Sequence, residues 1–196
     1  MVRPIAEWYS PVVPGTNLLH PRPGPPLSLI QYFPEIDTSL WPSSLWYPSR
    51  QGETVEEVHS RAEGFLSLFP QALDKKHPTI DRTRVLMVSH AATVIALARG
   101  LVGDREIPLK VGCCTVTELN LKPDQAEEGR EKGLLGAYHP VKLADGAHLK
   151  GGALREWGFD DVEVEKGRVV EDPGEPGTET EEDFPVGPQI HLISNL

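Results

Sequence analysis

One histidine in this sequence follows a short apolar run and precedes a second one. Val85-Leu86-Met87-Val88 leads directly into Ser89-His90, and the stretch from Val94 to Ala98 comes next. The first run predicts a buried strand over 84–88, and the second predicts a helix. In open α/β sheets ligands gather where a strand ends, and the N–H groups that open the next helix attract anions. His90 therefore suits hydrogen bonding to a phosphoryl oxygen, or else it is a strand-end histidine bonded to a neighbouring carbonyl.

A further helix is predicted before this unit. Thr54 and Glu57 have the spacing of a capping box, and Pro70 is expected to help end the helix. Apolar residues recur between them at helical spacing: Val55, Val58, Ala62, Phe65, Leu66 and Phe69. Arg61 lies on the polar side of this helix, and with Glu53 it is expected to brace the structure rather than to do chemistry.

Two more strands complete the predicted order of elements. Gly100 and Gly103 mark the end of the second helix. Residues 113–121 then predict a strand, residues 137–143 predict a weaker one, and the charged stretch 122–136 between them predicts a surface insertion. Helices and strands in this order indicate an α/β protein.

Composition narrows the classes of function. The chain has 19 Pro, 18 Gly and a net charge of -10, which argues against direct binding of nucleic acid or an anionic membrane. It shows no apolar core of a signal peptide and no run long enough to span a bilayer. The adjacent Cys113 and Cys114 are expected to be reduced, buried thiols of an intracellular protein, in cytoplasm or nucleus, and no metal-binding spacing accompanies them.

The two ends of the chain differ from its centre. Residues 1–50 are rich in proline but hold most of the tryptophans and tyrosines, so this part is expected to pack onto something. From Val169 onward the chain is acidic and rich in Pro and Gly, which predicts a disordered tail over 169–196. That tail is a solvated spacer or a protein-binding segment.

In combination, several of these segments resemble the histidine phosphatase (phosphoglycerate-mutase-like) superfamily. The segments that carry the resemblance, in chain order, are Ile5-Ala6-Glu7-Trp8, Gly52-Glu53-Thr54, Arg61, Val85 to Ala92, and Cys114 to Leu119. Each is weak alone, and their order and spacing make the case. The resemblance implies a three-layer α/β/α fold with a mostly parallel sheet, over residues 1–160. It implies no cofactor.

The resemblance also implies roles at matching positions. His90 would be the second active-site histidine, binding phosphate together with the start of the helix at Ala91. Glu7 would be the proton donor to the leaving oxygen, a role that a carboxyl fills only if its pKa is raised. The alternative for Glu7 is a solvated carboxylate. His20 is expected to be an ordinary loop histidine.

The chain departs from the superfamily pattern in one important respect. Members begin with a strand ending in Arg-His-Gly, whose histidine is the nucleophile, and that triplet does not occur in these 196 residues. Without the nucleophile, covalent catalysis by the family route is not expected. The missing strand and helix also leave the predicted sheet incomplete. The chain is then a fragment of a phosphatase, a rearranged non-catalytic domain, or a domain whose missing part another polypeptide supplies.

Two classes of function remain. The first is a phosphatase-like domain acting on a phosphate-containing small molecule or a phosphoprotein. The second is a non-catalytic assembly subunit, because Ser10 to Thr16 and His20 to Pro23 look similar to the eukaryotic branch found in the general transcription factor of RNA polymerase III. A protein partner would then bind the incomplete sheet edge or the acidic tail.

Overall fold

A computed structural model describes most of the chain between Ile5 and Glu171. The described residues are 5–13, 15, 19–20, 30–35, 48–79, 84–123, 133–161, 163–165 and 168–171. Most of the predicted acidic tail and residues 124–132 of the predicted insertion therefore lie outside the described residues. Within the described part, no helix is long and apolar enough to cross a membrane.

The first long helix, α2, covers Val55–Lys76 and begins with the predicted capping box. The Thr54 N–H donates to the Glu57 carboxylate at 2.7 Å, and the Glu57 N–H donates to the Thr54 hydroxyl at 3.2 Å. Pro70 lies inside α2 and does not end it, so that prediction was wrong. A proline removes one backbone donor, but the apolar face of the helix continues past it and stays packed through Phe69.

The second helix, α3, covers Ala91–Val102 and runs beside α2. Gly103 ends it in a left-handed conformation, as predicted, with φ of 82°. Gly100 lies within the helix, where a Cβ atom would come 3.1 Å from a methyl carbon of Leu66 on α2. Its role is therefore close packing of the two helices rather than termination.

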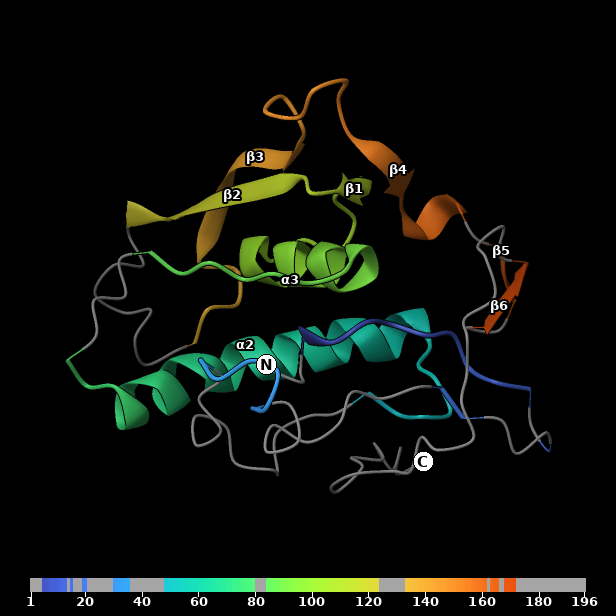
Figure 1. Ribbon diagram of the computed structural model, residues 1–196, viewed down its shortest axis with the longest axis horizontal. Coiled ribbons are helices and arrows are strands. Elements are labelled where there is room, and N and C mark those ends of the chain that lie inside the picture. Colours follow the sequence, from blue (N-terminus) through green and yellow to red (C-terminus); the bar gives the residue numbers. More distant parts are fainter. Residues whose placement is uncertain are drawn as a thin grey trace.

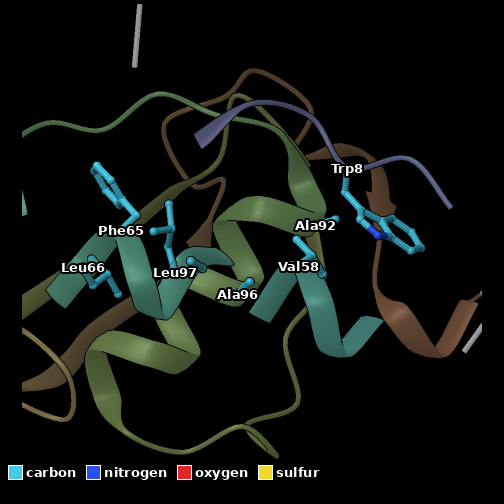
Figure 2. Packing of buried hydrophobic residues seen from close by; sticks show 8 residues of the cluster. Trp8, Val58, Phe65, Leu66, Ala92, Ala96 and Leu97 are labelled. Atoms are coloured by element: carbon cyan, nitrogen blue, oxygen red, sulfur yellow. The ribbon is translucent and has the colours of Figure 1, made fainter. Parts of the chain in front are cut away.

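The core lies between these two helices (Figure 2). Its buried hydrophobic members are Trp8, Val58, Ala62, Phe65, Leu66, Ala92, Ala96 and Leu97. The α2 members follow the helical spacing seen in the sequence, which confirms the predicted apolar face. Trp8 reaches this core from far along the chain and confirms that the aromatic N-terminal part packs onto the domain.

The strands form three antiparallel pairs. β1 (Val111–Cys113) pairs with β4 (Leu154–Trp157), β2 (Val116–Leu121) with β3 (Tyr138–Asp145), and β5 (Glu163–Glu165) with β6 (Arg168–Glu171). The predicted strand 113–121 is thus divided in two, because Cys114 has a φ of 60° that no strand accommodates. A short 3-10 turn, η3 (Phe159–Asp161), follows β4.

Two sequence predictions about the sheet differ from the structure. The strands of the described residues pair antiparallel, not parallel, and residues 84–90 form an extended segment without a strand partner there. Leu86 and Val88 are 87% and 79% exposed, because no strand or helix of the described part covers them. Cys113 and Cys114 are exposed as well, not buried. The α/β class holds: α3 lies between α2 and the β2–β3 pair (Figure 1).

Candidate functional site

His90 and Glu7, the two predicted site residues, lie in contact. His90 occupies the cap position before α3, with extended backbone, and its side chain does not cap the helix. Instead, Nδ1 of His90 lies 2.8 Å from Oε2 of Glu7. The fold thus joins two residues that the sequence separates by more than eighty positions. Ala91 follows as the first residue of α3, where backbone N–H groups have no partner within the helix.

The pair is half-exposed. The side chain of His90 is 56% exposed and that of Glu7 is 36% exposed. The hydrogen bond from Glu7 raises the pKa of His90 above its ordinary value, partial burial offsets some of that rise, and the negative charge of Glu7 adds to it. At neutral pH the carboxylate therefore favours a proton on the imidazole, although water screens the attraction.

Hydroxyl groups on both sides of His90 hold the segment that carries Glu7. The Ser89 hydroxyl donates to the carbonyl of Ile5 at 2.6 Å. The Thr93 hydroxyl donates to the carbonyl of Ala6 at 2.7 Å. Both bonds cross from the start of α3 to the N-terminal segment. The sequence reasoning missed these two residues.

Trp8 anchors the other side of Glu7. Its indole Nε1 donates to the carbonyl of Glu53 at 2.8 Å. Its ring lies 5.9 Å from that of Trp157 and 5.5 Å from that of Phe159. The backbone N–H of Trp8 also donates to Oε1 of Glu7 at 2.9 Å. The Glu7 carboxylate is therefore held by both of its oxygens.

A buried ion pair supports this arrangement from α2. Nε of Arg61 lies 2.8 Å from Oε1 of Glu53, and Nη2 lies 2.9 Å from Oε2. Nη1 of Arg61 also donates to the carbonyl of Ala6 at 3.3 Å. Both side chains are almost fully buried. Burial raises the pKa of Glu53, and the charge and hydrogen bond of Arg61 offset part of that rise. These two residues brace the fold, as the sequence predicted.

Comparison with known proteins places the chain. The model of the histidine phosphatase superfamily (branch 1) matches residues 26–130, which is more than half of the chain. This chain belongs to the histidine phosphatase superfamily. The match includes His90 and the Glu53–Arg61 pair, whereas Glu7 precedes it and Trp157 follows it.

One similar protein is the transcription factor tau 55 kDa subunit of Saccharomyces cerevisiae. It is 35% identical over 101 residues, which cover 52% of this chain and 22% of the yeast protein. The matched part thus spans about a fifth of the length of that relative.

Within this histidine-phosphatase domain, the other candidate residues lie elsewhere or serve the backbone. His20 stacks on Tyr9 with ring centroids 4.7 Å apart, and its Nε2 lies 2.8 Å from the carbonyl of Ser10, which fits a loop histidine. In the described ranges, no group of three or more His, Cys, Asp or Glu side chains could hold a metal ion. The arrangement at His90 can hold a proton between an imidazole and a carboxylate, with the helix start beside it.

Proposed function

We propose that this chain is an assembly domain: a histidine-phosphatase fold that joins a multi-subunit transcription factor and does not turn over phosphoesters. The observation that carries the proposal is the uncovered segment 85–88. An extended run of four apolar residues is typical of a strand buried on both faces. Here only Met87 packs against the core, whereas Leu86 and Val88 are exposed.

An apolar segment of this kind has one favourable partner, an extended segment of another polypeptide. Added beside residues 85–88, such a strand would satisfy the backbone groups and would place apolar side chains near Leu86 and Val88. It would also give the sheet the mostly parallel, three-layer form that the sequence predicts. The likeness to a transcription factor subunit supports this type of partner and a nuclear location.

We further propose that the Glu7–His90 site is what remains of a phosphate pocket, with His90 and the N–H of Ala91 as its anion-binding groups. A phosphate-containing small molecule or a phosphoprotein is the ligand class. In an active phosphatase Glu7 would donate a proton to the leaving oxygen, but here its carboxylate accepts a hydrogen bond from His90. That exchange of roles favours binding over catalysis.

Co-expression with defined subunits tests the assembly proposal. The partners are the same organism's counterparts of the other subunits of transcription factor tau, tested one at a time. We expect one of them to co-purify with the chain, and we expect Leu86→Lys and Val88→Lys to weaken that association at least tenfold. A lysine on an exposed strand opposes pairing without affecting the folded monomer.

Leu154→Lys is the matched control. Leu154 is 69% exposed on β4, so the same charge is added on another exposed apolar residue. This variant should associate like the unaltered chain. A chain that stays a clean monomer with every subunit would overturn the proposal, and so would equal binding by all three lysine variants.

A further inference from the structure

We propose that the hydroxyls of Ser89 and Thr93 position Glu7. They hold the backbone just before Glu7, so that its carboxylate keeps a proton on Nδ1 of His90. Nε2 of His90 is then the ring atom that the site presents to a ligand. This inference concerns the Glu7–His90 contact alone, and it holds or fails independently of the assembly proposed above.

Both hydroxyls are committed to distant backbone rather than to their own helix. Serine and threonine at a helix start commonly bond to nearby backbone groups. Ser89 and Thr93 instead donate to carbonyls that are 84 and 87 residues away in sequence. Thr93 is fully buried, so its contact with Ala6 is shielded from water. The two bonds fix consecutive peptide units directly before Glu7.

The remaining freedom of Glu7 is removed from its other side. Trp8 is anchored through its indole, and its N–H occupies Oε1 of Glu7. Oε2 is left for His90, at 2.8 Å from Nδ1. Arg61 also bonds the carbonyl of Ala6, but it is engaged by Glu53 and holds the core as well. The two hydroxyls are therefore the groups whose removal isolates the positioning effect.

The contact determines which nitrogen carries the proton. A carboxylate only accepts, so Nδ1 must donate, and in the neutral ring Nε2 is then the acceptor. Glu7 is the charged group that acts on His90 in the described part of the chain, and its hydrogen bond is the main cause of the raised pKa. The first turn of α3 has no acidic residue, and the nearby guanidinium of Arg61 on α2 is paired with Glu53.

An NMR titration of the histidine ring nitrogens in the full chain tests the inference. In the unaltered protein, neutral His90 should be the Nδ1–H tautomer with a pKa above 6.5. Glu7→Gln should lower that pKa and even out the two tautomers. Thr93→Val and Ser89→Ala should move both readouts in the same direction, and Thr93→Ser, which keeps the hydroxyl, should restore them.

His59 is the internal control for folding. Burial lowers its pKa, and its ring contacts the Val55 carbonyl and Arg99 but not the site. Its titration should stay the same in every folded variant. If Thr93→Val unfolds, Ser89→Ala decides, because Ser89 is only partly buried. An unchanged His90 titration in Ser89→Ala and in any folded Thr93→Val would overturn the inference, as would an unchanged tautomer in Glu7→Gln.

Discussion

The residues around Glu7 differ in how far the sequence reveals them. His90 and Glu7 were predicted from a strand–helix junction and a family resemblance, and they meet at 2.8 Å. Ser89 and Thr93 were missed, although they stand one residue before and three residues after His90. Their partners are backbone carbonyls at the far end of the chain, and no local pattern contains such a contact.

The Glu53–Arg61 pair gives a prediction at the same scale. Arg61→Met should lower the free energy of unfolding by about 3–5 kcal/mol, because it leaves the Glu53 carboxylate buried without a counter-charge. The double variant Glu53→Gln with Arg61→Met should recover part of that loss, since neither buried charge remains. Urea unfolding of the three proteins measures both quantities. A double variant that is less stable than the single one would contradict this reading of the pair.

At the scale of elements, helices were predicted better than strands. The apolar spacing and the caps of α2 and α3 are local, so the sequence contains what specifies them. A strand also needs a partner, and the apolar run 85–88 has none among the described strands. For the same reason β4, β5 and β6 were not predicted, because their short pairings depend on tertiary contacts.

The turn before α2 offers a prediction at this scale. Gly52 has a φ of 87°, and a Cβ atom there would lie 2.1 Å from the carbonyl oxygen of Ser10. Gly52→Ala should therefore destabilise the fold by more than about 1 kcal/mol, the cost of a left-handed alanine, because it also pushes away the segment that follows Glu7. Thermal unfolding monitored by circular dichroism gives the magnitude.

Gly151→Ala separates strain from collision. Gly151 has a φ of 96°, but nothing lies within 4 Å of its added Cβ atom. Its substitution should therefore cause only the conformational loss, and should leave the titration of His90 unchanged. Equal losses in the two variants would show that the contact with Ser10 is unimportant.

At the scale of the whole molecule, charge and site chemistry agree. A net charge of -10 repels anionic substrates at long range, and the carboxylate of Glu7 occupies the ring nitrogen that faces it. Arg61, the cation closest to the segment that carries Glu7, is paired with Glu53. A phosphoester bound here would find one imidazole and the start of one helix, without a bidentate arginine among these groups.

We therefore expect no turnover of a generic aryl phosphate by this chain. The purified protein and its His90→Ala variant should release aryl alcohol at the same background rate across the pH range in which His90 titrates. Equal traces in the two proteins would come from a contaminant. Activity that His90→Ala abolishes would show that the site is catalytic.

The anchoring of Trp8 has a consequence for the order of folding. Its indole ring packs against Trp157 and Phe159, which the ribosome adds long after it has made the N-terminal segment. Contacts between distant parts of a chain require the closure of a large loop and form late. The nascent chain therefore carries Glu7 unanchored through most of its synthesis. His90 gains its partner only when both ends of the domain have emerged.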